Sequence, residues 1–281
     1  MTLTSVSIVT ITQYERFECL KNLYDLILLQ DYSIIDEWII VEGSQRDDHI
    51  AINSDLINEF IANIKNPETK YGQSKMKIVY LCGEHSMPLS NLRNWGNTSS
   101  TGDIIVCMDD DDYYFPTRVS HAVKMLNYSN CEIAGCTAMY MYDYFLHKLY
   151  KFRGYHKNHS TNNCMAFTRE YLKTHAHKEG LSMAEEYSFT NGFTEPMVQL
   201  NPLKCIVVSS HDKNTYSKKS IIATVTATTT TTIATTTTTS EPTKTKGKSK
   251  AKVDLYEVTQ KNISIIIPPA IFNRMHSIFL E

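Results

Sequence analysis

Compact apolar segments alternate with stretches of helical periodicity along the first two-thirds of the chain. The apolar segments are rich in β-branched residues and have the length of buried strands. The predicted strands cover residues 5–11, 37–43, 76–82, 103–109 and 203–208. Helices are predicted where apolar residues recur every three or four positions, as at Phe17, Leu20, Tyr24, Ile27 and Leu28, and at Ile57, Phe60, Ile61 and Ile64. Two more helices are expected over residues 89–99 and from Pro116 onward.

This alternation predicts an α/β fold with a mostly parallel central sheet and helices on both of its faces. Strands without polar positions are buried on both sides, which is typical of parallel sheets covered by helices. Right-handed crossovers bring the carboxyl ends of such strands to one edge of the sheet. Ligands bind at that edge, so the residues just after each strand are the candidates for function.

The composition changes sharply after this globular part. We expect a domain over residues 1–216, followed at 217–252 by a disordered linker rich in Thr and Lys, which offers little apolar area for a core. Residues 253–281 regain apolar character but are short for a domain. Three roles are open for this last segment: docking on the domain, binding a partner, or remaining loose.

Charge and composition narrow the class of protein. The 281 residues carry a net charge of −2, which argues against a nucleic-acid partner. No apolar run reaches 18 residues, so no transmembrane segment is predicted, and the amino terminus lacks the basic region of a signal peptide. The seven cysteines form no C-x-x-C pair, which indicates reduced thiols and a cytoplasmic location.

The most informative segment is CMDDDDYYFP at residues 107–116, in which four aspartates follow a predicted buried strand. Carboxylates about 6 Å apart repel each other by roughly 3 kcal/mol at an effective dielectric constant near 20. A divalent cation such as Mg²⁺ or Mn²⁺ would relieve this repulsion and could also bind phosphates. The alternative is a solvated acidic turn in which Asp112 caps the following helix.

Three segments of the chain together resemble successive motifs of family 2 glycosyltransferases. They are SVSIVTITQYERFECLKNLYDLILLQDY at 5–32, WIIVEGS at 38–44 and LSNLRNWGNTSSTGDIIVCMDDDDYYFPTRV at 89–119. The resemblance spans residues 5–215 and implies the GT-A fold. It also implies metal-dependent, inverting transfer from a nucleotide-diphosphate sugar, with a UDP-sugar favoured, to a hydroxyl of a glycan or other acceptor. Mn²⁺ or Mg²⁺ would be the cofactor.

The resemblance also implies roles for individual residues of the acidic segment. Asp109, Asp110 and Asp111 match the Asp-X-Asp motif, with Asp111 as the direct metal ligand. Asp109 and Asp110 would contact the ribose or the water shell of the metal, and Asp109 is a second candidate metal ligand. Arg93 and Asn94 match the pair that shapes the nucleotide site, and Arg93 could also pair with the acidic cluster.

Further nucleotide contacts are expected at the ends of the first two strands. Thr10 and Thr12 lie at the end of the first strand, where the family contacts the nucleotide. Glu42 stands where the family usually has an aspartate that reads the base or ribose. Because the chain has glutamate in place of this aspartate, the identity of the nucleotide stays open.

Two residues farther along the chain complete the predicted site. Glu186, in AEEYSF at 184–189, matches the position of the base that deprotonates the acceptor; the alternative is a charged first turn of a helix. His211 follows the strand at 203–208, and a histidine in this region of related enzymes ligates the metal or contacts the diphosphate. Imidazole favours Mn²⁺ over Mg²⁺, and Asn214 is placed to assist. A surface histidine in a polar turn is the alternative.

Other interpretations stay open from the sequence. Nucleotidyl transfer to a sugar phosphate normally needs a Gly-rich loop after the first strand, and residues 10–18 contain no glycine. A catalytically inactive relative that binds a glycan or a partner is the stronger rival. For the aromatic stretch 138–156 we favour an amphipathic strand pair over a sugar-stacking wall. Frequent Asn, Ile, Tyr and Lys suggest an AT-rich genome such as that of a giant DNA virus, and hence a host cytoplasm.

Overall fold

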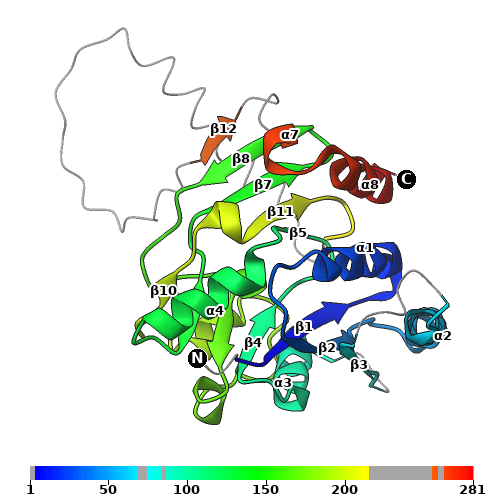
Figure 1. The fold of residues 1–281 in the computed structure, drawn as a ribbon, viewed down its shortest axis with the longest axis horizontal. Helices are drawn as coiled ribbons and strands as arrows, with labels where there is room; N and C mark the ends of the chain where they lie inside the picture. Colours follow the sequence, from blue (N-terminus) through cyan, green and yellow to red (C-terminus); the bar gives the residue numbers. More distant parts are fainter. Residues whose placement is uncertain (1–3, 69–74, 84–86, 215–254, 259–262, 281) are drawn as a thin grey trace, which may run out of the picture.

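The computed structural model describes residues 4–68, 75–83, 87–214, 255–258 and 263–280 (Figure 1). The first half of the chain alternates strands and helices, as the sequence predicts. Its elements are β1 (Val6–Thr12), α1 (Phe17–Leu28), β2 (Ile35–Glu42), α2 (Asp47–Lys65), β3 (Lys77–Leu81), α3 (Leu89–Ser99), β4 (Ile104–Cys107), β5 (Tyr113–Tyr114) and α4 (Arg118–Tyr128).

The second half is built from shorter elements. They are β6 (Ile133–Gly135), β7 (Met139–Asp143), β8 (Lys148–Phe152), β9 (Ala166–Thr168), α5 (Glu186–Phe189), β10 (Val198–Gln199), β11 (Ile206–Ser210), β12 (Leu255–Val258), α7 (Ile263–Ile266) and α8 (Pro269–Leu280). The stretch 138–156 forms the antiparallel pair β7–β8, with Met141, Tyr142 and Tyr150 buried, which confirms the strand-pair interpretation.

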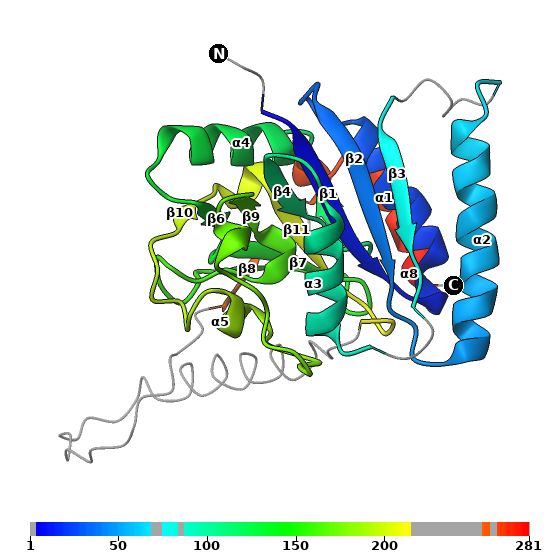
Figure 2. The same ribbon diagram turned by 90° about the horizontal axis from the view of Figure 1, so that it is seen from below.

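The central sheet has the strand order β10-β6-β9-β4-β1-β2-β3. Neighbouring strands are parallel except for β9, which runs antiparallel to both β4 and β6. Helix α3 lies on one face of β1 and β2, and α1 lies on the other (Figure 2). The predicted mostly parallel sheet with helices on both faces is therefore confirmed.

Alternate residues of the strands build two apolar layers. Ile8 and Trp38 pack with Leu23 of α1 in the larger layer, whereas Val9 and Ile39 pack with the α3 side in the smaller one. Strands that are apolar on both faces are what the uninterrupted β-branched segments predicted. This packing fixes the carboxyl ends of β1, β2 and β4 at one edge of the sheet.

A second sheet, which the sequence did not reveal, has the order β12-β8-β7-β11-β5. Its strands are short, and β5 has only two residues. Strand β4 ends at Cys107, earlier than predicted, because the Asp109 amide donates to the Tyr114 hydroxyl instead of a neighbouring strand. Strand β11 begins later than predicted, at Ile206, because a 3-10 turn at Pro202–Lys204 precedes it.

The predicted linker 217–252 lies outside the described residues. Beyond it, β12 pairs antiparallel with β8, and α8 lies beside α1. Of the three roles left open for the last segment, the structure shows docking on the domain. Within the described parts of the chain, no helix has the length and apolar character needed to cross a membrane.

Gly96 marks the closest approach of α3 to the sheet and gives a test of this packing. A Cβ atom there would lie 2.6 Å from Val9 Cγ1 and 3.0 Å from Val41 Cγ2, two stiff side chains of buried strands. We expect Gly96→Ala to lower the free energy of unfolding by about 1–3 kcal/mol, because overpacking outweighs the gain in helix propensity. Chemical denaturation measures this. Thr98→Ala, on the exposed side of α3, should change stability by less than about 0.5 kcal/mol, and equal effects would contradict the packing argument.

Candidate active site

The acidic turn 109–112 begins where β4 leaves the sheet, next to the carboxyl ends of β1 and β2. Residues Thr12 and Glu42 are paired in the β1–β2 register at the same edge. Three of the four aspartates are buried, with exposed fractions of 1% for Asp110, 6% for Asp111 and 1% for Asp112. The solvated-turn interpretation is therefore wrong, and the charges must be balanced inside the protein.

Asp112 is held by structural contacts. Its carboxylate accepts hydrogen bonds from Asn163 Nδ2 at 2.6 Å and from the Ser209 amide at 2.8 Å. It thus joins the acidic turn to β11 and does not cap the helix after Pro116, for which the N-cap residue is Thr117. This link also brings the end of β11 close to the other aspartates.

The first functional cluster forms around Asp111. His211, at the end of β11, lies with Nε2 3.1 Å from Asp111 Oδ2, and Asn214 Nδ2 donates to the same oxygen at 2.9 Å. The His211 side chain is 1% exposed, so the surface-histidine alternative is wrong. The structure thus brings together two residues a hundred positions apart that the sequence proposed as metal ligands.

Arg16 is the counter-charge of this cluster, and the sequence analysis missed it. Its Nη1 lies 3.0 Å from Asp110 Oδ1 and 3.2 Å from Asp111 Oδ2, and Thr12 donates to Asp110 Oδ2 at 2.7 Å. The guanidinium also donates to the Lys213 carbonyl. Burial opposes the charge on Arg16, but Asp111 and Asp110 more than offset this and raise its pKa. Its position, four residues after β1 and beside a predicted acidic edge, was the available signal.

Burial disfavours the charged form of the Asp110 carboxylate, as it does that of Arg16, but for Asp110 the neighbouring groups do not outweigh it. Burial, together with the nearby charge of Asp111, raises the pKa of Asp110 despite the opposing effects of Arg16 and Thr12. One guanidinium therefore does not fully compensate two buried carboxylates.

Asp111 and His211 fit two ligand positions of a divalent cation. Two neighbouring ligands of an octahedral ion, each about 2.1 Å from it, are about 3.0 Å apart, and the Asp111 oxygen and His211 nitrogen lie 3.1 Å apart. Among the described residues, no three His, Cys, Asp or Glu side chains form a ready-made metal site. The remaining ligands would therefore come from water and from phosphates, as Mg²⁺ sites commonly require.

Arg16 and a cation would compete for Asp111, which gives a testable consequence. In buffer free of divalent ions, we expect Arg16→Met to lower stability by about 3–5 kcal/mol, because it removes the guanidinium that forms ion pairs with two buried carboxylates. Added Mn²⁺ should then raise the melting temperature of the variant more than that of the wild type. Differential scanning fluorimetry with and without Mn²⁺ measures both effects.

Arg46→Met is the matched control, because Arg46 pairs with Asp48 at the exposed surface. It should leave the melting temperature and its response to Mn²⁺ unchanged. An Arg16→Met variant that behaves like this control would contradict the role assigned to Arg16.

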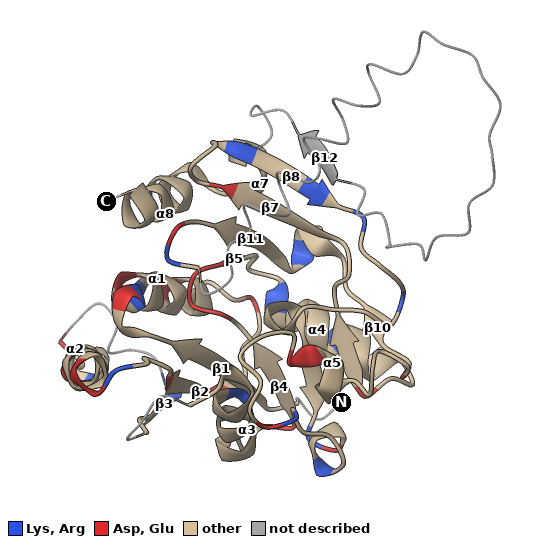
Figure 3. Cartoon of the chain, turned by 180° about the vertical axis from the view of Figure 1, so that it is seen from behind, with Lys and Arg blue, Asp and Glu red and all other residues tan. Residues whose placement is uncertain are grey.

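Arg93 builds the second functional cluster. The side chain is 8% exposed and donates from Nε to Glu185 Oε1 at 2.7 Å and from Nη1 to Asp109 Oδ1 at 3.0 Å. The structure thus pairs Asp109 with Arg93, and Asp111 with His211. Through Arg93, the acidic turn is connected to α5, whose first residue is Glu186. The acidic start of this short helix is coloured red in Figure 3.

The two neighbouring glutamates have different acidities. Burial opposes ionisation of Glu185, but the charge and hydrogen bond of Arg93 outweigh it and lower the pKa of Glu185. Burial, together with the negative charge of Glu185, raises the pKa of Glu186 to about 7. A carboxylate with a pKa near neutrality is suited to accept a proton in a reaction at that pH.

Asn94 supports the segment that leads to α5. Its side chain donates to the His177 carbonyl and accepts from the His177 amide, both at 2.8 Å. His177 in turn contacts the Glu185 carbonyl through Nδ1 at 3.1 Å. Asn94 therefore fixes the position of the glutamate pair, in addition to any contact with a nucleotide.

Two predicted nucleotide contacts are engaged in internal hydrogen bonds. Thr10 is fully buried, donating to the Met108 carbonyl at 2.8 Å and accepting from Trp38 Nε1 at 2.9 Å. Glu42 accepts hydrogen bonds from the Ser44 amide, from Asn53 and from Tyr80. Both side chains therefore point into the protein, where their hydrogen bonds stabilise the edge of the sheet.

Aromatic rings border the predicted base. Tyr187, next to Glu186, is 61% exposed, and its ring lies 5.7 Å from that of Phe193 in a T-shaped contact. The ring centroids of Phe193 and His159 are 4.8 Å apart, and those of His159 and Tyr155 are 4.7 Å apart. Phe193 has a φ of 59°, which is uncommon for an aromatic residue. Exposed rings of this kind commonly contact the apolar faces of organic ligands.

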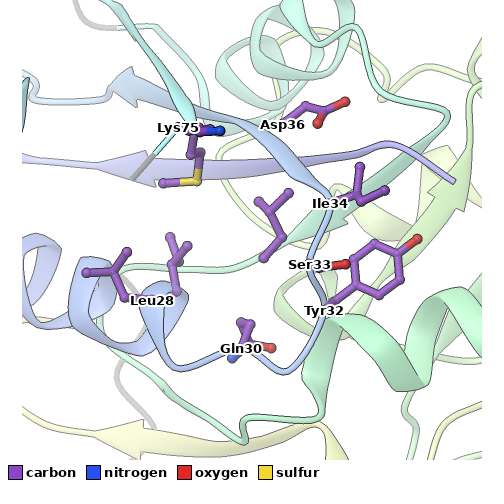
Figure 4. Close-up of a pocket in the computed structure, with 10 residues that line it drawn as sticks. Leu28, Gln30, Tyr32, Ser33, Ile34, Asp36 and Lys75 are labelled. Atoms are coloured by element: carbon purple, nitrogen blue, oxygen red, sulfur yellow. The ribbon is translucent and has the colours of Figure 1, made fainter. Parts of the chain in front are cut away.

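A surface hollow of about 440 Å³ lies elsewhere (Figure 4). It is lined by residues between the end of α1 and the starts of β2 and β3, including Leu28, Tyr32, Ile34 and Asp36. This is the opposite end of the strands from the acidic turn. It is therefore separate from the candidate active site.

Comparison of the structure with solved structures places it in a known fold class. The mannosyltransferase PcManGT from Pyrobaculum calidifontis, solved with GDP-Man and Mn²⁺, matches with a TM-score of 0.54 and 14% identity, over 75% of this chain and 58% of that chain. TarS 1-349 from S. aureus, solved with UDP-GlcNAc, matches with a TM-score of 0.52 and 14% identity, over 75% and 60% of the two chains. The chain thus spans about three-fifths of the length of these structures and has the α/β GT-A fold.

A comparison of the sequence with known families identifies the family of the chain. The model of glycosyl transferase family 2 matches residues 7–177, more than half of the chain, so the protein belongs to this family. No curated protein matches the sequence significantly. The resemblance inferred from the motifs is thereby confirmed at the level of family and fold.

Proposed function

We propose that the chain is a metal-dependent, inverting glycosyltransferase. It would transfer a sugar from a nucleotide-diphosphate donor, with a UDP-sugar favoured, to a hydroxyl of a glycan or other acceptor. The observation that carries this proposal is the bridge from Asp109 through Arg93 to Glu185, which connects the acidic turn to Glu186. Family membership and the nucleotide-sugar ligands of PcManGT and TarS support it.

The donor would bind at the carboxyl edge of the sheet. Thr12, Glu42, Asn94, Asp109 and Asp110 are the proposed nucleotide side of the site, and Thr10, which is fully buried, would support it from within β1. Asp111 and His211 would hold Mn²⁺ or Mg²⁺, with Mn²⁺ favoured because one ligand is imidazole. When bound, such a cation neutralises charge on the two phosphates and stabilises the departing diphosphate.

Glu186 would perform the proton transfer. Its carboxylate accepts the proton of the acceptor hydroxyl while that oxygen forms a bond to the anomeric carbon of the donor sugar. The bond from this carbon to the diphosphate oxygen breaks, and its electron pair leaves with the diphosphate. A single displacement inverts the anomeric centre. Burial and the charge of Glu185 raise the pKa of Glu186 to about 7, and Arg93 keeps Glu185 ionised.

The exposed rings beside Glu186 support a carbohydrate acceptor. Tyr187 and Tyr155 are 61% and 58% exposed, and the rings of Phe193 and His159 connect them. Sugar rings present apolar C–H faces that pack on such surfaces, while their hydroxyls remain available to a base. This arrangement fits a glycan better than a small charged acceptor.

A catalytically inactive binding protein is the second candidate, and one observation favours it. Arg16 already contacts both Asp110 and Asp111, so part of the charge that a cation would balance is balanced without one. Such a protein would bind a sugar nucleotide or glycan without turnover. Slow hydrolysis of the sugar nucleotide by the purified chain would distinguish the enzyme from it.

A donor screen tests the proposal directly. The full chain is mixed with a panel of UDP- and GDP-sugars, with and without Mn²⁺, and its melting temperature is recorded. A donor at a hundred times its Kd stabilises the fold by about 2.7 kcal/mol, which corresponds to a shift of about 5–10 °C. A shift that requires both donor and Mn²⁺ is expected. If no sugar nucleotide changes the melting temperature, the proposed donor class is wrong.

A further inference from the structure

The last helix of the chain reaches the candidate metal ligands. Helix α8 lies beside α1 (Figure 1), and Arg274 of α8 forms an ion pair with Asp25 of α1. Met275 is 1% exposed, so α8 has a buried side against the domain. Near its end, the Ile278 carbonyl accepts a hydrogen bond from Lys213 Nζ at 3.3 Å. Lys213 is two residues from His211, so the end of α8 is held against the loop after β11.

Phe279 of α8 packs directly on His211. The two rings are stacked with centroids 4.0 Å apart and planes 9° apart. The Phe279 ring also contacts Tyr144, at 4.7 Å between centroids. His211 is therefore covered on one face by an aromatic ring that is itself held in place by a second.

This stack restricts the histidine, and the ring of Phe279 does not cover the edge of the imidazole that carries Nε2. Asn214 Nδ2 lies 2.9 Å from Nε2 and would have to give way to a bound metal. The donor lone pair of an imidazole nitrogen lies in the plane of the ring, whereas Phe279 covers a face. The Nε2 edge points to Asp111, 3.1 Å away. Rotation of the His211 ring would move this edge away from Asp111 and would break the parallel contact with Phe279. The partners that orient a ligating histidine commonly determine its affinity for the metal.

We propose that Phe279 is a positioning residue for the cation site, supplied by the C-terminal segment beyond the Thr/Lys-rich stretch. This inference rests on the proposed function, in which His211 and Asp111 hold a divalent cation. Phe279 presets the orientation of the imidazole, so that His211 reaches the cation without first losing rotational freedom. Helix α8 is then part of the donor site.

Mn²⁺ binding to the full chain tests this inference without an activity assay. The concentration of unbound Mn²⁺ is followed by electron paramagnetic resonance in a titration of each variant. We expect Phe279→Ala to weaken Mn²⁺ binding by about tenfold. Phe279→Tyr, which retains a flat ring, should restore the wild-type affinity. An unchanged affinity for Phe279→Ala would overturn the proposal.

Phe272→Ala is the matched control on the same helix. The ring of Phe272 contacts Tyr142, Tyr144 and His276, and it serves the docking of α8. We expect this variant to bind Mn²⁺ with less than threefold loss. If Phe272→Ala weakens binding as much as Phe279→Ala, docking of the helix and not the stack is responsible, and the role of Phe279 is wrong.

The outcomes also separate this inference from the proposed function. If the wild type binds no Mn²⁺, with or without UDP, the proposed metal dependence itself fails. If the wild type binds Mn²⁺, His211→Ala loses it and Phe279→Ala does not, only the positioning role of Phe279 fails.

Discussion

Asp111→Asn should abolish Mn²⁺-dependent glycosyl transfer while the protein remains folded. Asp111 is the oxygen donor that lies next to His211, and an amide replaces its charge with a much weaker ligand. Loss of the cation removes several kcal/mol of stabilisation of the departing diphosphate, so kcat/KM should fall about 10³-fold or more. Initial rates with the donor found in the screen, together with Mn²⁺ titrations of the variant, measure this loss.

Two other Asp→Asn substitutions distinguish the loss of a metal ligand from the general effect of removing a carboxylate charge. Asp36→Asn changes an exposed carboxylate at the opposite end of the strands and should leave activity and Mn²⁺ affinity unchanged. Asp112→Asn should reduce stability, because Asp112 is buried and binds Asn163 and Ser209, yet the variant should retain Mn²⁺ affinity where it is folded. Wild-type activity in Asp111→Asn would refute the assignment of the metal ligand.

The elements that carry the site were predictable because their signals are local. Apolar β-branched segments marked β1, β2 and β4, and parallel topology then placed Thr12, Glu42 and the acidic turn at one edge. The family resemblance indicated that His211, after the strand at 203–208, could join Asp111 as a metal ligand. His211 does lie next to Asp111, although the sheet that carries β11 was not predicted.

The strand pair at 138–156 and the strand at 203–208 were predicted, but their assembly into a second sheet and the docking of α8 had no comparable signal. Strand β5 of the second sheet has only two residues, too few for a periodic pattern. The pairing of β12 with β8 depends on contacts between residues about a hundred positions apart, which no window of sequence contains. The stack of Phe279 on His211 is of the same kind, because nothing in the segment that carries Phe279 indicated this partner.

Charge pairing explains why Arg16 and Glu185 were harder to identify than the aspartates. A run of four carboxylates must be balanced, but the sequence does not say by which cation. The structure divides the run between Arg16, which faces Asp110 and Asp111, and Arg93, which faces Asp109. Arg93 then links two parts of the proposed reaction, because the Glu185 that it neutralises neighbours Glu186.

Glu186→Gln should remove catalysis and leave donor binding intact. A glutamine side chain has nearly the same shape but accepts no proton from an acceptor hydroxyl. The rate of transfer should fall by about 10²–10⁴-fold, the usual contribution of a positioned general base. The melting-temperature shift given by donor and Mn²⁺ should be preserved. Glu179→Gln, which changes an exposed glutamate in the preceding loop, is the control and should be fully active.

The pH dependence provides an independent test of the same residue. Because the pKa of Glu186 is raised to about 7, the wild-type rate should fall as the pH drops below neutrality and the carboxylate becomes protonated. A carboxyl group with a raised pKa in the folded state binds protons more tightly there than in the unfolded chain. Its contribution to stability is therefore lost as the pH rises from about 4.5 to 7.

Glu186→Gln lacks this titration, so the variant should be more stable than the wild type above pH 7 although it is inactive. A gain of stability combined with a loss of activity is expected for a residue kept in an unfavourable environment for catalysis. If Glu186 had only a structural role, stability and activity would decrease together in the variant. Unimpaired transfer by Glu186→Gln across the pH range would assign the base to another residue.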